Sequence, residues 1–306
     1  MLGPVLETLI GGLLTGVLYS LVALGFVLIF KASGVFNFAQ GAMVLFAALS
    51  LARLSEFMPL ALALPLAVLI MVALAYAIEF LVLRHLVNQD GIVLFMATLG
   101  IAYFLEGFGQ TIWGSDIYKI SLGLPQNPIF ILESIFPGGL LIDPAELIAA
   151  VICAVLVLVL AVFFQVTRVG RALRAVADDH QAAQSVGIPL NQIWLMVWAV
   201  AGIVALVAGM MWGAKLGVQF SLSLIALKAL PVLILGGFTS IPGAIVGGLI
   251  IGAGEKLSEV VLGPVLIRTF DLAGGGIENW FAYMLALVFL LFRPQGLFGE
   301  RIIERV

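Results

Sequence analysis

The chain has 306 residues, of which 63% are hydrophobic and 10% are charged, against about 25% charged in a typical soluble domain. So much apolar surface cannot be buried in a soluble fold of this size, and the mean hydropathy of +1.23 therefore predicts a membrane protein. The net charge of −3 argues against a nucleic-acid partner. The one cysteine, Cys153, lies in an apolar run, and His85 and His180 stand apart, so neither a disulfide nor a metal site is expected.

Charge-poor apolar runs of about 20 residues, the length that spans a bilayer, define the predicted transmembrane helices. The predicted spans in chain order are 7–31, 31–53, 56–79, 91–113, 147–166, 191–211, two shorter segments at 220–237 and 242–254, and 279–292. Residues 114–146 are expected to form a loop, and a second mixed loop is expected from 255 to 278. The pattern predicts an all-α polytopic membrane protein with eight or nine transmembrane helices, in one transmembrane domain over residues 1–306.

Basic residues in short loops indicate the orientation, because such loops are enriched in Lys and Arg on the cytoplasmic side. They follow three of the spans, at Arg84, Arg168, Arg171, Arg174, Arg293, Arg301 and Arg305. Placing all three groups in the cytoplasm requires an odd number of crossings and so favours nine. The N-terminus is then predicted to lie outside and the C-terminus in the cytoplasm.

One glycine-bounded polar patch occurs twice: residues 34–46 read GVFNFAQGAMVLF and residues 236–248 read GGFTSIPGAIVGG. Paired Gly/Pro-interrupted apolar segments are a sequence indication of a transporter's substrate pathway, and irregular backbone at membrane depth requires cover by protein or a water-filled cavity. The predicted substrate-pathway residues are Asn37, Phe38, Gln40, Gly41, Gly236, Gly237, Thr239, Pro242 and Gly243.

Close helix packing is the alternative interpretation of both patches, because Gly and Ala are the usual contact residues of membrane helices. The predicted spans also place the patches six crossings apart, hence in parallel, whereas inverted repeats need an odd separation. Glu106 and Lys228 fall inside predicted spans, where ionisable residues are candidates for function. A structural role is favoured for both, and a role in the pathway stays open.

The polar segment 168–190 begins RVGRALRAVADDHQAAQSVGIP and shows a helical pattern of small apolar residues. Gly187 followed by Pro189 is a helix stop signal. The segment is predicted to be a short cytoplasmic helix that lies against another protein. The alternative is a solvated loop whose arginines only fix the topology.

Within this segment, Gln181-Ala182-Ala183 followed by Gly187 resembles the Glu-Ala-Ala…Gly loop of ABC importer permeases, with Gln181 where Glu is common. The whole chain is similar to branched-chain amino-acid (LivH-type) permeases. The stretches that carry the resemblance are NFAQGAMV, GRALRAVADDHQAAQSVGI, LPVLILGGFTSIPGAIVGGLIIG and FRPQGLFG. The resemblance implies a coupling helix that docks on an ATPase subunit. The residues expected to couple are Arg171, Arg174, Asp179, Gln181, Ala182, Ala183 and Gly187.

The resemblance also implies partners: a second homologous permease, two cytoplasmic ATPases and a solute-binding protein outside the membrane. The chain has no GxxxxGK[ST] phosphate-binding loop of its own, and neither a cofactor nor an enzymatic activity is expected. The expected function is the translocation subunit of an ATP-driven importer for branched-chain amino acids or a related small amphipathic solute. Urea, amides and aromatic acids stay open as substrates, as does homo- or heterodimeric pairing of the permeases.

Two other functions are alternatives to importer translocation. A stand-alone ion-coupled carrier or channel would need ionisable groups inside several spans, and only Glu106 and Lys228 are available. An intramembrane enzyme is disfavoured because Ser20 and Ser33, the candidate nucleophiles, have no histidine or acid pair at suitable spacing.

Overall fold

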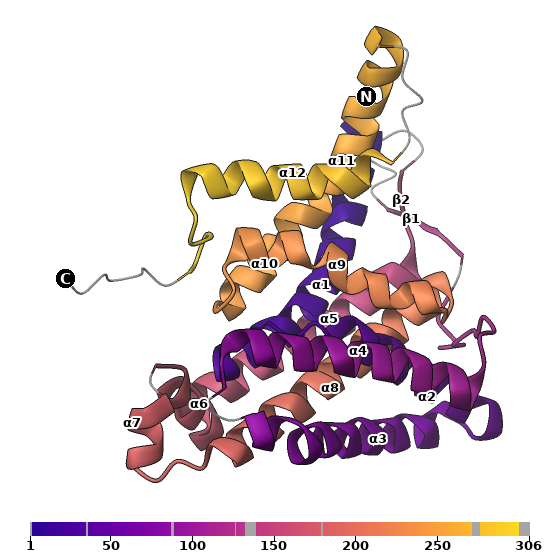
Figure 1. Ribbon diagram of the computed structural model, residues 1–306. Coiled ribbons are helices and arrows are strands. Elements are labelled where there is room, and N and C mark those ends of the chain that lie inside the picture. Colours follow the sequence, from indigo (N-terminus) through magenta and orange to yellow (C-terminus); the bar gives the residue numbers. More distant parts are fainter. Residues whose placement is uncertain are drawn as a thin grey trace. The chain divides into compact units, whose positions relative to one another are not determined.

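The computed structural model describes residues 2–34, 36–86, 89–125, 127–131, 139–178, 180–270 and 276–299, and most of them are helical (Figure 1). The helices in chain order are α1 Leu2–Ser33, α2 Gln40–Phe57, α3 Leu60–Leu81, α4 Gly91–Trp113, α5 Pro144–Val166, α6 Arg168–Asp178, α7 His180–Ser185, α8 Leu190–Leu216, α9 Ile225–Lys228, α10 Leu230–Gly236, α11 Ile241–Phe270 and α12 Ile277–Phe292. Two short 3-10 helices, η1 Leu83–Leu86 and η2 Phe220–Leu224, and two strands, β1 Ile129–Ile131 and β2 Leu140–Ile142, complete the described elements. The strands form an antiparallel pair within the predicted 114–146 loop.

The apolar helices confirm the predicted all-α polytopic class. Among the described residues, α1, α3, α4, α5 and α8 supply five helices that are long and apolar enough to cross a membrane. A sixth is present if Phe220–Gly236 and Ile241–Thr269, which meet at a bend of 114°, count as one broken span. The helices α2 and α12, of 18 and 16 residues, are not among these, so the crossing number of eight or nine stays a prediction.

The predicted loop over residues 255–278 was wrong from 255 to 270, because α11 continues without a break from Ile241 to Phe270, and residues 271–275 lie outside the described residues. The mixed apolar and charged sequence of this stretch predicts a loop. Glu and Lys are good helix formers, so Glu255, Lys256 and Glu259 do not by themselves end a helix. Lys256 forms an ion pair with Glu278 of α12 instead.

The chain divides into two compact units. Unit 1 comprises residues 1–23, 123–155 and 227–306, and unit 2 comprises residues 24–122 and 156–226. Two long helices, α1 and α5, therefore contribute residues to both units. The single transmembrane domain expected over residues 1–306 stays a prediction.

In unit 1, glycines bring α1 and α11 into backbone contact. A Cβ atom built on Gly16 would lie 2.5 Å from the carbonyl oxygen of Gly248, and one on Gly12 would lie 2.7 Å from that of Gly252. The hydroxyl of Ser20 donates to the carbonyl oxygen of Gly16 at 2.8 Å. Small residues allow membrane helices to approach this closely and to gain dispersion contacts along their backbones.

In unit 2, α2 is the central helix. Every residue from Gln40 to Ala52 is buried, so α2 shows no apolar stripe but is covered on all sides. It packs against α3, α4, α8 and η2. At the contact with α8, a Cβ atom on Gly209 would lie 2.5 Å from the carbonyl oxygen of Val44, so glycine is required there for the observed packing.

Candidate functional site

Both copies of the repeated patch form the same local structure, a helix break at a glycine with a positive φ angle. In unit 2, α1 ends at Ser33, Gly34 has φ +70°, and α2 begins at Gln40. In unit 1, α10 ends at Gly236, Gly237 has φ +104°, and α11 begins at Ile241. Positive φ is readily adopted only by glycine, which explains why the sequence places glycine at both breaks.

The amides of the first patch are directed into the protein. Asn37 and Gln40 are fully buried. The side-chain oxygen of Asn37 accepts the backbone N–H of Ala39 at 3.0 Å, and its amide nitrogen donates to the side-chain oxygen of Gln40 at 3.3 Å. Among the described residues, the amide nitrogen of Gln40 has no hydrogen-bond partner. These two side chains therefore brace the turn that starts α2, and their predicted role in a substrate pathway stays a prediction.

Gly41 brings the first patch against the segment that leads into α9. A Cβ atom at this position would overlap the carbonyl oxygen of Ser223 and would lie 2.9 Å from the Cβ of Ala226. Glycine here lets η2 and α9 lie directly on the start of α2. The first patch therefore combines a helix break with a close approach between segments nearly two hundred residues apart in the chain.

Aromatic rings form the more accessible side of the first patch. Phe38, which is 36% exposed, lies with its ring centroid 4.7 Å from Phe36 and 4.7 Å from Phe95 of α4, both in edge-to-face geometry. Phe36 also stacks on Phe26 of α1 at 4.7 Å. Such a face can contact an aliphatic side chain without taking a polar group out of water. The sequence pattern indicated Phe38 but not Phe26 or Phe95, because their contacts depend on how the helices pack.

The second patch is held by backbone contacts rather than by buried amides. A Cβ atom on Gly236 would overlap the carbonyl oxygen of Gly243, and one on Gly243 would overlap that of Gly236. Gly237 is buried with them, Thr239 is half-buried and Pro242 is exposed. The hydroxyl of Ser240 accepts the N–H of Gly243 at 3.0 Å, which satisfies a donor in the first turn of α11.

The C-terminal stretch FRPQGLFG packs on this second patch. The N–H of Leu297 donates to the carbonyl oxygen of Leu235 at 2.8 Å, and the N–H of Phe298 donates to that of Gly236 at 3.1 Å. Two stretches that carried the family resemblance separately in the sequence thus form one backbone-bonded structure in unit 1. A role of the second patch in the substrate pathway also stays a prediction.

The polar segment 168–190 is helical, as predicted, over α6 and α7, and residue 179 between them lies outside the described residues. Gly187 has φ +86°, which ends the helical stretch at the predicted glycine. Arg174 donates to the carbonyl oxygen of Phe164 at 2.7 Å, and Arg171 donates to that of Val166 at 3.0 Å. Both arginines therefore cap the C-terminal end of α5, where cations are favoured by the helix dipole.

The exposed surface of this segment lies on α7 and the turn that follows it. Ala182 and Gly187 are exposed, whereas Ala183 is buried against the rest of unit 2. Val186 is 78% exposed, which leaves a large apolar side chain amid small and polar neighbours. Of the other expected coupling residues, Asp179 lies outside the described residues and Gln181 is described by its backbone alone.

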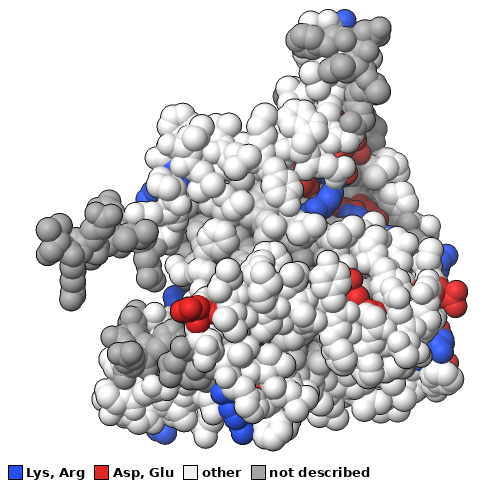
Figure 2. Space-filling model, in the orientation of Figure 1, with Lys and Arg blue, Asp and Glu red and all other residues white. Residues whose placement is uncertain are grey.

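A cluster of charged side chains lies in unit 1 where α9, α11 and α12 meet. The Nζ of Lys256 lies 3.0 Å from Oε2 of Glu278, and the Nζ of Lys228 lies 3.9 Å from Oε1 of the same carboxylate. Figure 2 shows red and blue side chains gathered near the crossing of α11 and α12, on a face that is otherwise mostly white. Lys228, for which a structural role is favoured and a pathway role stays open, is thus part of an ion-pair network. Glu106, the other ionisable residue predicted inside a span, is half-buried on α4.

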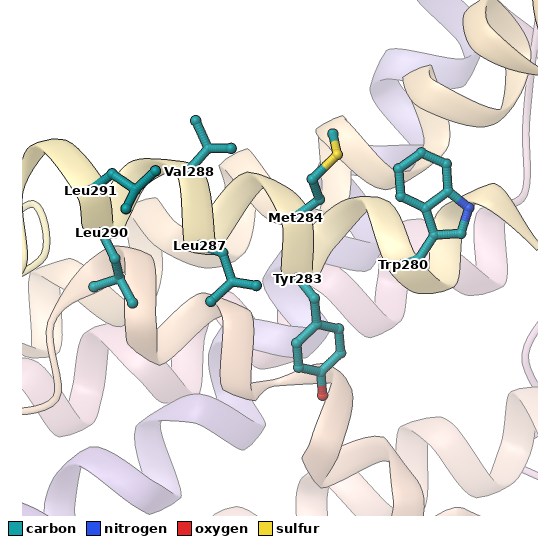
Figure 3. A pocket seen from close by; sticks show the side chains of 7 residues that line it. All are labelled: Trp280, Tyr283, Met284, Leu287, Val288, Leu290 and Leu291. Carbon is teal, nitrogen blue, oxygen red and sulfur yellow. The ribbon is translucent and has the colours of Figure 1, made fainter.

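The outer face of α12 is apolar and forms a shallow depression (Figure 3). Trp280, Met284, Leu287 and Leu291 are all exposed along it. Lipid tails or another apolar helix would cover such a face in a membrane. Among the described residues, no group of three or more His, Cys, Asp or Glu side chains could hold a metal ion.

Comparison with known proteins identifies the family. The family model described as "Branched-chain amino acid transport system / permease component" matches residues 8–293. The chain is 29% identical to the high-affinity branched-chain amino acid transport system permease protein BraD of Pseudomonas aeruginosa, over 98% of both chains. It is 26% identical to the corresponding protein LivH of Escherichia coli, over 98% of this chain and 97% of LivH. Among solved structures, PsaBC from Streptococcus pneumoniae in complex with Fab matches at 13% identity with a TM-score of 0.48, over 96% of this chain and 97% of the other. The chain belongs to the family of permease components of branched-chain amino acid transport systems.

Proposed function

We propose that this chain is the inner-membrane translocation subunit of an ATP-driven importer for branched-chain amino acids or a related small amphipathic solute. The observation that carries the proposal is the family match over residues 8–293, together with relatives of the same length that are named as branched-chain amino acid permeases. The absence of a GxxxxGK[ST] loop in the sequence supports a separate ATPase as the source of energy.

The ATPase is proposed to dock on the exposed side of α7 and the turn at Gly187. Val186 supplies an apolar anchor there, and the small neighbours Ala182 and Gly187 allow close approach. Movement of this segment would be transmitted to α5, because Arg171 and Arg174 of α6 are hydrogen-bonded to its last carbonyl groups. The other partners proposed from the family are a second homologous permease and an external solute-binding protein.

The substrate is proposed to pass the two helix breaks on its route. The first break presents the ring of Phe38 and its aromatic neighbours, which suits an aliphatic side chain. The second break offers Thr239 and Pro242 at its more accessible side. Irregular backbone of this kind is tolerated at membrane depth where protein or a water-filled cavity covers it.

The orientation is proposed from the basic residues. The arginines of α6 and Arg293, which directly follows α12, would lie in the cytoplasm together with the C-terminus. The N-terminus would then lie outside. Cysteine labelling from each side of sealed cells, at Ser185→Cys and Gly3→Cys in a Cys153→Ser background, tests this. Labelling of both sites from the same side would contradict it.

Reconstitution tests the function. The complete importer in proteoliposomes is expected to take up labelled leucine only when binding protein is outside and ATP is available to the ATPases. An ionophore that collapses ion gradients should leave this uptake unchanged. Uptake by the permease without ATPase, or uptake that survives without ATP but stops with the ionophore, would instead support the stand-alone carrier.

A further inference from the structure

The ion cluster consists of Lys228, Lys256 and Glu278, with Glu255 and Tyr19 beside them, all in unit 1. Both lysines approach the one carboxylate of Glu278. Glu255 is 2% exposed and is hydrogen-bonded to Tyr19 of α1, and it is attracted by the charges of Lys228 and Lys256. With Glu259 of α11, which interacts with Glu278 and Lys256, the cluster contains two ammonium groups and three carboxylates, contributed by α9, α11 and α12.

The location of this cluster is costly for a membrane protein. Glu255 and Lys256 lie in the middle of α11, a 30-residue helix with long apolar stretches. Lys228 is the last residue of α9, directly before the break that leads into α10. The hydroxyl of Tyr283 donates to the carbonyl oxygen of Leu227 at 2.6 Å and so satisfies backbone at this break. Ionisable residues at such depth are expensive and face a bundle interior or an aqueous cavity.

The ion pair between Arg84 and Glu79 in unit 2 has a different geometry. In unit 2, Arg84 donates to both carboxylate oxygens of Glu79, at 3.3 and 3.1 Å, and the Glu79 side chain is 2% exposed. One guanidinium there matches one carboxylate. In the ion cluster, by contrast, Lys228 and Lys256 share Glu278, and these three side chains are 34%, 40% and 27% exposed. The accessible side of the cluster therefore presents two ammonium groups beside the carboxylate of Glu278, with the exposed carboxylate of Glu259 close by.

An amino acid carries the complementary pair of charges, a carboxylate and an ammonium group on one carbon atom. Lysine ammonium groups can donate to a carboxylate, and a glutamate can accept from an ammonium group, in both cases through charge-assisted hydrogen bonds. The 3.9 Å separation between Lys228 and Glu278 is longer than such a bond, so Lys228 can turn toward a ligand without breaking a short contact.

We propose that the ion cluster binds the charged head group of a zwitterionic amino acid during translocation. Lys228 and Lys256 take the carboxylate, and Glu278, with Glu255 behind it, takes the ammonium group. This inference rests on the proposed function and specifies how the substrate is recognised within the permease. It applies to amino acids as a class, because the head group is common to all of them.

Direct binding is the first test, and it uses the purified importer with both permeases and both ATPases but no binding protein. We expect L-leucine to bind, and we expect L-leucinamide, which lacks the carboxylate, and 4-methylpentanoate, which lacks the ammonium group, to bind about tenfold more weakly or worse. Equal binding of the three compounds, or no binding of leucine to a complex that imports leucine, would overturn the inference. Failure of the wild-type importer to take up leucine would instead count against the proposed function.

Variants assign the two charges. Lys228→Met should lower leucine binding about tenfold while leaving leucinamide binding unchanged. Glu278→Gln should lower leucine binding about tenfold while leaving the binding of 4-methylpentanoate unchanged. Lys228→Arg should retain most of the leucine binding. The matched control is Lys215→Met, which removes a lysine of α8 that lies over the ring of Trp212 outside the ion cluster.

Transport by the same variants separates recognition from folding. In proteoliposomes, Lys228→Met should reduce leucine uptake about tenfold, whereas ATP hydrolysis stimulated by the binding protein should stay within about twofold of the wild-type rate. A parallel fall of uptake, hydrolysis and melting temperature would identify the ion cluster as a structural element only. If a variant cannot be purified, the comparison of leucine with its two analogues on the wild-type complex still decides the question.

Discussion

The two repeated patches share a sequence pattern and a backbone event, but different forces hold them. The first, in unit 2, adds buried side-chain amides to the close backbone approach at Gly41: Asn37 accepts a backbone N–H and bonds Gln40, and both are fully buried. The second, in unit 1, depends on glycine backbones in contact at Gly236 and Gly243 and on hydrogen bonds from the C-terminal segment. The comparison teaches that a repeat in sequence can mark a repeated helix break without repeating the chemistry around it.

The largest effect is expected at the second patch, from Gly243→Ala. The added Cβ would overlap the carbonyl oxygen of Gly236, and backbone on both sides cannot move aside cheaply. We expect a loss of about 3 kcal/mol or more in stability, measured as a lower melting temperature and a lower yield of purified complex. The control is Gly100→Ala on α4, where a Cβ would meet nothing within 4 Å. Equal melting temperatures for the two variants would show that the glycine contact is not what holds this break.

The next largest effect is expected at the first patch, from Asn37→Ala. This change leaves the N–H of Ala39 without its acceptor and Gln40 without its partner, both in buried surroundings. We expect a loss of about 1–3 kcal/mol in stability. Ser240→Ala in the second patch removes a comparable bond to the N–H of Gly243 but at a half-buried site, and should cost about 1 kcal/mol or less. If Ser240→Ala proved the more damaging, the contrast between amide-held and backbone-held breaks would be wrong.

Much of the helical structure could be predicted because the chain marks many helix ends locally. The predicted span 91–113 coincides with α4, which Asp90 precedes and Gly114, at φ +79°, ends. The bend between α10 and α11 was likewise indicated by the glycines and Pro242. Such signals need only neighbours in the sequence, because positive φ and proline geometry are local properties.

The features that could not be predicted depend on partners far away in the chain. Glu255 and Lys256 were assigned to a loop because nothing near them in the sequence reveals Glu278 and Tyr19 as their partners. In the same way, the sequence cannot tell whether the amide of Asn37 faces a route or braces its own turn. That choice is made by the burial of α2 among α3, α4, α8 and η2. The substrate-pathway and coupling assignments therefore remain predictions that mutagenesis can test.

A smaller effect on stability, but a clear one on coupling, is expected from Gly187→Arg. Gly187 has φ +86° and is exposed, and a Cβ atom built on it would meet nothing within 4 Å. The cost of the substitution is therefore the backbone strain alone, about 1 kcal/mol, and the variant should still insert into the membrane. The bulk and charge would obstruct the proposed docking surface, and leucine uptake should fall while ATP hydrolysis loses its dependence on the binding protein. Gly123→Arg is the matched control, because Gly123 also has a positive φ, of +64°, and nothing within 4 Å, but lies in the predicted outer loop. Normal coupled uptake by Gly187→Arg would contradict docking at this turn.

The smallest effect on stability is expected from Phe38→Ala, and it returns to the first patch. Because Phe38 is 36% exposed, truncating it should cost only about 1 kcal/mol, well below the usual penalty for removing a core phenylalanine. If the aromatic face contacts the substrate's aliphatic side chain, leucine uptake should nevertheless fall several-fold, and uptake of a smaller amino acid such as alanine, if the importer accepts it, should fall less. Phe104→Ala, on the more exposed face of α4 at 61% exposure, is the control and should leave both rates unchanged. An equal loss for the two amino acids would mean that the rings only support the break that Asn37 and Gln40 hold. The first patch would then be a structural element only, and the route would have to be sought elsewhere in the molecule.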